Sequence, residues 1–321
     1  MSNVFQVDFP LNYLNMNEIK VFSPASVSNI CCGFDVLGFA VDGLGDIISL
    51  KKTNKKGVFI KNTTGFNIPL DIKKNTATVA LLAFLDKLNY SQGFEISIEK
   101  NIKPGSGLGS SAASAAGSVF AANLLLGEPF TLHQLVEFAM QGELISSESA
   151  PADNIASALF GGIVLVDNFK KYHVINLPAP QDVFAVIHHP LISRSTYESR
   201  NELPKNVLLK KASYQLTNIA SFVHSLHTNN IDLMKRSLND HLVQNQREFF
   251  FSYFKKIKSI SCNMGSICCS ISGSGPSIFS LVRGYKLAEK IKLQLDKEFV
   301  QMDIEFNSYL SAFGSQGVRV I

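Results

Sequence analysis

The sequence predicts an α+β protein of two domains. Segments typical of strands and segments typical of helices are mixed along both halves of the chain, which is the pattern of this class. The length of 321 residues suits about two domains, and a hydrophobic content of 46% is ample for their cores. A stretch rich in Pro and Lys near residues 170–180 is the best boundary, so we expect domains over 1–175 and 176–321.

In the first half, alternation of apolar and polar residues predicts strands, and longer apolar or Ala-rich runs predict helices. Thr76 is placed to cap the helix that follows it, and Thr131 starts another helix. In chain order we expect strands over 19–23 and 46–52 with a polar loop over 24–35 between them, a helix over 76–88, a strand over 94–99, helices over 112–126 and 131–144, and strands over 162–166 and 183–187.

After about residue 175 the pattern changes to long helical segments. They are followed by alternating strand and helix patterns up to the end of the chain. We expect helices near 206–228 and 231–251, a strand over 277–282, a helix near 286–299 and a final strand near 302–307.

Charge and cysteine patterns argue against several classes of function. The 30 basic residues are spread among 26 acidic ones, for a net charge of +4 without a long basic tract, so nucleic-acid binding is not indicated. The five cysteines form no Cys-x-x-Cys, which argues against zinc, and we expect reduced, buried thiols in a cytoplasmic protein. The uncharged run between Lys103 and Glu128 is long enough to span a bilayer, but its Gly, Ser and Ala content favours a buried helix instead.

The most informative motif is a glycine- and serine-rich turn that leads directly into the Ala-rich helix. Glycines let backbone N–H groups approach a ligand closely, and a helix N-terminus adds free N–H donors, so the two together suit a phosphate. The glycine spacing and the lack of Gly-Lys-Ser/Thr argue against a P-loop and a dinucleotide-binding fold. A plain turn before a tightly packed helix is the alternative. The motif consists of Pro104, Gly105, Ser106, Gly107, Leu108, Gly109, Ser110 and Ser111.

Acidic and amide residues indicate ligand contacts at two other places. Asn29 and Asp35, six residues apart after the first strand, suit an ammonium or hydroxyl group, although both residue types are also common in turns. Glu143 late in a helix, and Asp153-Asn154 in the loop before the next apolar run, are candidates to hold Mg²⁺ together with phosphate oxygens. The alternative is a solvated helix end and an N-cap at Asp153 or Asn154.

Three further features are weak signals by themselves. The Ser-Gly-Ser-Gly-Pro-Ser segment over 272–277 has the small residues of the first loop, but without a partner motif a hairpin turn is the better explanation. Arg200 and Arg247 carry guanidinium groups that match carboxylates and phosphates. The histidines, including His188-His189 after a strand, form neither a nucleophilic nor a metal-binding set.

The order of these motifs along the chain resembles that of the GHMP kinases. Pro-Ala-Ser-x-x-Asn-x-x-x-Gly-Phe-Asp-x-Leu-Gly comes first, Pro-x-x-Gly-Leu-Gly-Ser-Ser-Ala-Ala comes next, and Ser-Gly-Ser-Gly-Pro-Ser comes late. Within that family the chain is most similar to the homoserine kinases, and the similarity covers nearly the whole chain after residue 18. The marks that carry it are the segments 33–38, 142–147, 152–156 and 160–162, Thr196-x-x-x-Arg200 with Leu203-Pro204, and 316–320.

The resemblance implies a fold, two cofactors and a reaction. The fold would be a ribosomal-S5-like N-terminal domain and a ferredoxin-like C-terminal domain with the active site between them. The cofactors would be ATP and Mg²⁺, and the reaction would transfer the γ-phosphoryl group to the hydroxyl of L-homoserine in threonine biosynthesis. Family habit also makes a homodimer an expectation.

The resemblance also implies residue roles. The loop from Pro104 to Ser111 would wrap the ATP phosphates, and Ser111 and Glu143 would hold Mg²⁺. Asn154 stands where some relatives carry a catalytic aspartate, so we expect no strong general base. The acceptor would be oriented by Asn154 and Thr196, its amino end would meet Asn29 and Asp35, its carboxylate would meet Arg200 and Arg247, and Gly273 and Ser274 would complete the substrate site.

One position departs from the family pattern. Homoserine kinases usually carry a substrate-pocket histidine where this chain has Pro151, and proline has no side-chain donor. Three functions therefore stay open: a homoserine kinase, a GHMP kinase for another small alcohol, and a non-catalytic binding protein of this fold. The intact glycine-rich loop, Ser111 and Glu143 argue against the third.

Overall fold

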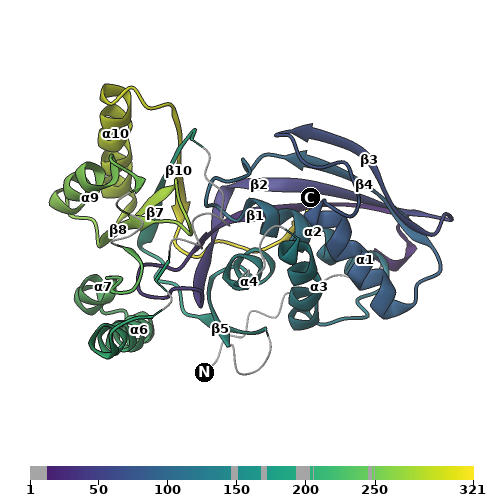
Figure 1. Ribbon diagram of the computed structural model, residues 1–321, viewed down its shortest axis with the longest axis horizontal. Coiled ribbons are helices and arrows are strands. Elements are labelled where there is room, and N and C mark those ends of the chain that lie inside the picture. The colour runs from purple at the N-terminus through teal and green to yellow at the C-terminus, as the bar shows by residue number, and fades with distance from the viewer. Residues whose placement is uncertain are drawn as a thin grey trace.

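Two sheets, each covered by helices, form the protein and confirm the α+β class (Figure 1). The computed structural model describes residues 13–145, 151–167, 172–192, 203–204, 206–244, 248 and 250–321. The first sheet lies in one half of the molecule and the second sheet in the other half.

The first sheet has the strand order β11-β1-β2-β4-β3, and β5 and β6 extend it from β2. The β3–β4 pair is parallel and the other pairs are antiparallel. A register shift between Pro24 and Ala25 marks an irregularity in the β1–β2 pair. The strands are β1 (Glu18–Ser28), β2 (Leu37–Thr53), β3 (Gly57–Gly65), β4 (Gly93–Lys100), β5 (Ile163–Asp167), β6 (His173–Leu177) and β11 (Arg319–Val320).

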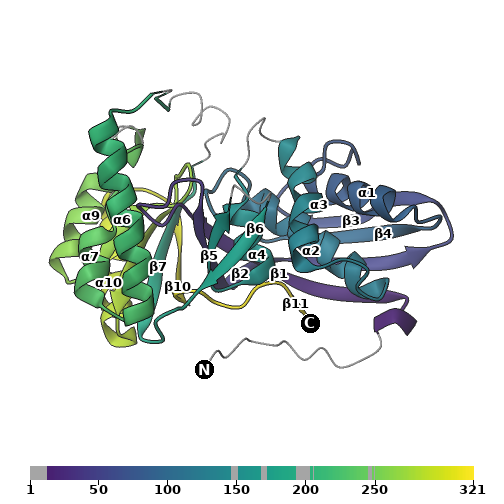
Figure 2. The same cartoon turned by 90° about the horizontal axis from the view of Figure 1, so that it is seen from below.

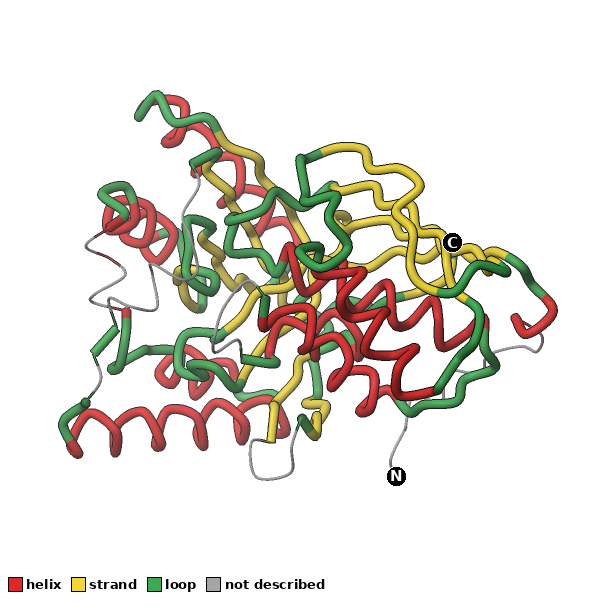
Figure 3. Tube along the Cα trace, turned by 45° about the vertical axis from the view of Figure 1, so that its right-hand side comes forward, coloured by secondary structure: helices red, strands yellow, loops and turns green. Residues whose placement is uncertain are grey.

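Helices pack on one face of this sheet, as Figures 2 and 3 show. They are α1 (Thr76–Leu88), α2 (Ser110–Leu125), α3 (Leu132–Leu144) and α4 (Asp153–Phe160). Every residue of α2 except Ser111 is buried, because its Ala, Gly and Ser side chains let neighbouring elements approach closely. The central helix is therefore rigidly held, and its half-buried second residue is the place where it meets solvent.

The second sheet is antiparallel, with the order β10-β7-β9-β8. Its strands are β7 (Val183–Pro190), β8 (Cys268–Ile271), β9 (Ile278–Arg283) and β10 (Phe306–Ala312). Helices α9 (Phe254–Asn263) and α10 (Tyr285–Gln301) share a core with these strands, while α6 (Leu209–Thr228) and α7 (Ile231–Ser237) pack beside them (Figure 1).

One hydrophobic cluster joins the two sheets. Phe39 of β2 makes edge-to-face contacts with Phe279 of β9 and with Phe313, at centroid distances of 5.9 and 5.0 Å. All three side chains are buried. The loops between the sheets are thus held over a common core, and β11 of the last segment pairs with β1 of the first sheet. The division into 1–175 and 176–321 stays a prediction.

Most expected elements are present, but several bounds were wrong. The predicted polar loop over 24–35 is strand up to Ser28, since residues 24–28 are buried and their polar groups find partners in the fold. Asn75, not Thr76, caps α1, because its side chain accepts from the N–H groups of Ala77 and Thr78. Strands β3, β6, β8 and β11 and helices α4 and α9 were not predicted.

The helix expected over 231–251 is interrupted: α7 ends at Ser237, and Gln244, Glu248 and Phe250 are helical again. The Asp240 carboxylate accepts from the N–H groups of Leu242 and Val243, which gives the backbone an alternative to helix here. The last strand expected near 302–307 lies instead at 306–312, because α10 continues to Gln301 and Asp303 has a left-handed φ of 56°.

Candidate active site

The glycine-rich loop joins β4 to α2 and leaves the start of the helix open. Gly105, Gly107 and Gly109 have φ values of 72°, 76° and 65°, which residues other than glycine rarely adopt. Gly109 is the N-cap residue of α2, and no side chain caps the helix there. The N–H groups of the first turn are therefore available to an anion, and the binding of phosphate by this loop stays a prediction.

A second loop, over 272–277, locks the first one in place. The Ser272 hydroxyl donates to the carbonyl of Gly107 and the Ser277 hydroxyl donates to that of Ser106, both at 2.6 Å. A Cβ on Gly107 would lie 2.7 Å from the carbonyl oxygens of Ser272 and Gly275. The segment is therefore the turn that connects β8 to β9, and it also binds the first loop. The hairpin turn and the association with the glycine-rich loop are both present.

A buried ion pair supports the loop from below. Lys100 at the end of β4 forms a salt bridge with Asp46 of β2, and both side chains are almost fully buried. Lys100 also donates to the Ser110 carbonyl and, at 2.8 Å, to the Ser114 hydroxyl, both in α2. Burial lowers the pKa of Lys100, and the neighbouring Asp46 carboxylate opposes that shift. The pair thereby ties two strands to the first turn of the helix.

Ser111 and Glu143 lie side by side at the open end of α2. Burial raises the pKa of the Glu143 carboxyl, while a hydrogen bond with Ser111 and the positive charge of Lys100 oppose the rise. Glu143 is half-buried as a residue, but its Oε1 atom is enclosed. Thr76 Oγ1 donates to the Ser111 carbonyl at 3.3 Å, which fixes the turn. A carboxylate and a hydroxyl next to a phosphate loop are hard oxygen donors that fit Mg²⁺.

The loop after β1 has an unusual backbone. Asn29, Ile30, Cys31 and Asp35 all have positive φ, which is costly for a β-branched residue such as Ile30. The Asn29 side chain accepts from the N–H of Asp35 at 2.9 Å and donates to the Gly273 carbonyl at 3.4 Å. Asn29 therefore links this loop to the 272–277 loop, and Asp35 is left half-buried beside it.

Asp153 and Asn154 are the first two residues of α4. They were expected in a loop, and this was wrong. The alternative of an N-cap at Asp153 or Asn154 is also wrong, because Ala152 is the N-cap. Asp153 is buried, whereas Asn154 is half-buried and its Oδ1 accepts from the Ser26 hydroxyl at 2.8 Å. Ser26 also donates its N–H to the Leu108 carbonyl at 3.1 Å. The glycine-rich loop, β1 and α4 thus meet at Ser26.

The sequence did not single out Ser26, Asp46, Lys100 or Gln215 as contributors to this site. Gln215 of α6 is buried and donates to the Cys32 carbonyl, which anchors the 29–35 loop. Such residues look like ordinary polar positions in a sequence, and their roles depend on partners distant along the chain. Thr196, Arg200 and Arg247 lie outside the described residues, whereas Pro104, Ser274 and Pro151 lie within them.

Other side chains in the described part of the chain do not extend the site. His188 and His189 are buried within β7 rather than after it, because the strand runs to Pro190. The described residues contain no group of three His, Cys, Asp or Glu arranged to hold a metal ion. The five cysteines are unpaired, and Cys262 is half-buried while the other four are buried as expected.

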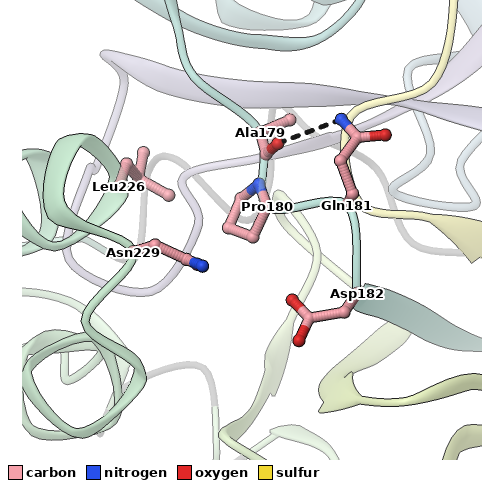
Figure 4. A pocket seen from close by; sticks show the side chains of 6 residues that line it. All are labelled: Ala179, Pro180, Gln181, Asp182, Leu226 and Asn229. Carbon is pink, nitrogen blue, oxygen red and sulfur yellow. Dashed lines mark hydrogen bonds between the residues drawn. The ribbon is translucent and has the colours of Figure 1, made fainter.

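A separate shallow pocket of about 320 Å³ lies between the segment after β6 and the turn between α6 and α7 (Figure 4). None of the predicted site residues lines it. Among the described residues, no helix is both long and apolar enough to cross a bilayer.

Named relatives are similar to this chain over nearly its whole length. Residues 75–162 match the family model for the N-terminal domain of GHMP kinases. The homoserine kinase of Chlorobium phaeobacteroides is 34% identical over 320 residues, covering 95% of this chain and 100% of the relative. That of Xanthomonas campestris is 30% identical and covers 95% of each chain.

Solved structures are also similar to this chain over nearly its whole length. The crystal structure of homoserine kinase from Cytophaga hutchinsonii superposes with a TM-score of 0.91 at 42% identity, over 96% of this chain and 98% of that one. The mevalonate kinase of L. major shares the fold, with a TM-score of 0.70 at 14% identity, over 96% of this chain and 99% of that one. The fold, the glycine-rich loop and these relatives therefore define a GHMP kinase. Within that family the chain belongs to the homoserine kinases.

Proposed function

We propose that this protein transfers the γ-phosphoryl group of ATP to the hydroxyl of L-homoserine, giving O-phospho-L-homoserine for threonine biosynthesis. The observation that carries the proposal is the uncapped start of α2 behind the positive-φ glycine loop, with Ser111 and Glu143 beside it. Similarity to homoserine kinases over nearly the full chain supports the choice of acceptor.

The ATP phosphates would lie on the loop from Gly105 to Ser111. Backbone N–H groups and the positive end of α2 would neutralise their charge without having to move during the reaction. The hydrogen bonds from Ser272 and Ser277 hold the carbonyls of Gly107 and Ser106, so these two acceptors are not left facing the phosphates.

Mg²⁺ would be held by Ser111 and Glu143 together with phosphate oxygens. One or two protein oxygens plus phosphates is the usual way in which proteins hold this ion. The ion would neutralise charge on the phosphates. Lys100, close enough to favour the ionised form of Glu143, would help to keep that ligand charged.

The acceptor would bind between the first loop and the 272–277 loop. In this proposal Asn29 and Asp35 meet its amino end, Arg200 and Arg247 meet its carboxylate, and Gly273 and Ser274 complete the site. Both ends of the Asn29 amide already hold protein groups, which supports a role in shaping the pocket as well as in binding.

Phosphoryl transfer would proceed without a strong general base. A loose transition state needs positioning and charge neutralisation more than proton removal. Asn154, at the edge of the phosphate loop, and Thr196 and Arg200 would orient the hydroxyl and the transferring group. The amide of Asn154 has no basic atom that takes up a proton near neutral pH.

A second acceptor is favoured by one residue. Pro151, half-buried just before α4, stands where homoserine kinases usually carry a histidine, so another small alcohol is the alternative substrate. A homodimer and a cytoplasmic location stay predictions from the family.

The experiment is ADP release by the purified protein with ATP and Mg²⁺, comparing L-homoserine with a panel of small alcohols. The proposal expects turnover with L-homoserine well above the rest. Faster turnover with another alcohol would retain the kinase and change the substrate. Nucleotide binding without turnover with any acceptor would favour a binding protein.

A further inference from the structure

We propose that Ser26 is a positioning residue of the kinase, because its hydroxyl fixes the side-chain amide of Asn154 in one orientation. This inference rests on the proposed function, in which Asn154 lies beside the transferring group. The orientation decides whether Asn154 presents a hydrogen-bond donor or an acceptor to the phosphates.

The contact between the two side chains is specific and enclosed. Ser26 is fully buried, and its hydroxyl donates to Asn154 Oδ1 at 2.8 Å across 128 residues of sequence. Its own backbone N–H is bound to the Leu108 carbonyl, so the serine is fixed on the phosphate loop. Gly109 packs closely against the Ser26 hydroxyl, since a Cβ at position 109 would lie only 2.1 Å from the hydroxyl oxygen.

The hydrogen bond leaves the other end of the amide available. Asn154 is half-buried, and among the described residues no partner binds its Nδ2 group. With Oδ1 occupied by Ser26, the group that remains for a ligand is a donor of two N–H bonds. A donor stabilises negative charge on phosphoryl oxygens, whereas the flipped amide would present an oxygen and repel them.

Sequence separation explains why the pair is not visible as a motif. Ser26 belongs to β1, and Asn154 begins α4, so only the packing of α4 against β1 brings them together. Ser26 touches the loop and Asn154 but would not itself touch the reacting atoms.

The test compares kcat and the KM values for ATP and acceptor in S26A, N154A and the double variant. The matched control is S261A, which removes a buried hydroxyl that is bonded to Ser280 at 2.8 Å in the α9–β9 contact. Wild-type turnover with L-homoserine tests the proposed function separately, and the variants are measured with whichever alcohol the wild type phosphorylates.

We expect S26A to lower kcat about 10- to 100-fold with KM values changed by less than about threefold, since loss of one oriented donor costs roughly 10²–10³ in rate. In the N154A background, removing the hydroxyl should change kcat by less than about twofold, because no amide is left to orient. S261A should retain wild-type kcat even if its melting temperature falls.

Two results would overturn the inference. One is that the effects of S26A and N154A multiply as independent changes, which a merely structural serine would produce. The other is that N154D retains wild-type kcat: Asp keeps the acceptor for Ser26 but replaces the donor by a carboxylate oxygen. S26C, which keeps the volume and weakens the donor, replaces S26A if the alanine variant fails to fold, with the same expectations for kcat and for the double-variant comparison.

Discussion

Single side chains in this protein are tuned mainly by burial. Burial raises the pKa of Glu143 and lowers those of Lys100 and His189, and in each case a charged neighbour changes the shift. Burial of an ionisable group destabilises its charged form unless a partner or a ligand compensates the charge. Mutation of such buried ionisable residues can therefore separate effects on function from effects on stability.

Glu143→Gln should abolish most activity without unfolding the protein. The substitution removes the carboxylate proposed to hold Mg²⁺, and we expect kcat/KM to fall by at least about 10²-fold, since charge stabilisation at the phosphates is lost. The melting temperature should be unchanged or higher, because burial already disfavours the charged form.

The measurement is steady-state kinetics over a range of Mg²⁺ concentrations, combined with thermal unfolding. Glu137→Gln on the exposed side of the same helix is the matched control and should behave like the wild type. Equal kinetics for the two variants would exclude Glu143 as a ligand.

His189 should make the protein less stable in mild acid. Burial lowers the pKa of this histidine from 6.5 to about 4, with a smaller contribution from Lys103. The unfolded chain therefore binds a proton between pH 6.5 and about 4 that the folded chain does not, and the free energy of unfolding falls as pH falls through this window. The difference in pKa corresponds to about 3 kcal/mol.

Urea unfolding at a series of pH values measures this effect. In His189→Gln the loss between pH 6.5 and 4 should be smaller than in the wild type, while the loss at lower pH from Asp296, whose pKa is about 2, should remain. An unchanged profile in the variant would show that another group causes the dependence.

At the scale of elements, the site depends on how strands hold the start of α2. Asp46 and Lys100 come from neighbouring strands, and both bind groups of the helix or of the turn before it. A buried ion pair gives little net stability compared with apolar residues, but loss of one partner leaves an uncompensated charge. The main effect of the pair is therefore to fix the geometry of the glycine-rich loop and the first turn of α2.

Lys100→Met should destabilise the protein by about 3–5 kcal/mol, because Asp46 would stay buried without its partner. The double variant Asp46→Leu/Lys100→Met should recover much of that loss. Lys20→Met, which breaks the exposed pair between Lys20 and Glu99, is the control and should cost less than about 1 kcal/mol. Urea unfolding measures all three variants, and equal losses in the two single variants would contradict the expectation.

The sequence predicts elements well where a local signal exists. Helix α1 matched its predicted bounds, and α3 began after the Thr131 cap, because caps and apolar periodicity are local. The glycine loop was found for the same reason. Strand β3 and Ser26 were missed, since an exposed edge strand and a buried serine acquire meaning only from partners far along the chain. The proposed roles of Thr196, Arg200 and Arg247 stay predictions.

At the scale of the whole molecule, one core couples the two sheets. Phe39, Phe279 and Phe313 fill the space between them, and the two glycine-rich loops are bonded across the same boundary. Motion of one sheet against the other would break both sets of contacts. We therefore expect the site to be rigid where the loops meet, which favours preorganised charge stabilisation.

Phe39→Ala should destabilise the whole protein by about 3–5 kcal/mol and leave a single unfolding transition. The physical reason is that the aromatic cluster belongs to both sheets, so its loss weakens them together. Circular dichroism and tyrosine fluorescence should report the same midpoint; the chain has no tryptophan, and its tyrosines serve as probes. Separate midpoints for the two probes would show that the sheets unfold independently.

Because β11, near the end of the chain, pairs with β1, the second sheet is inserted in the sequence between strands of the first sheet. Strands of the first sheet come from both sides of it along the chain, at residues 18–177 and at 319–320. A chimera between relatives that exchanged everything after residue 175 would give β1 a neighbour from a different parent. The natural module for recombination is the segment between β6 and β11, joined at two points, with each crossover placed outside the paired strands.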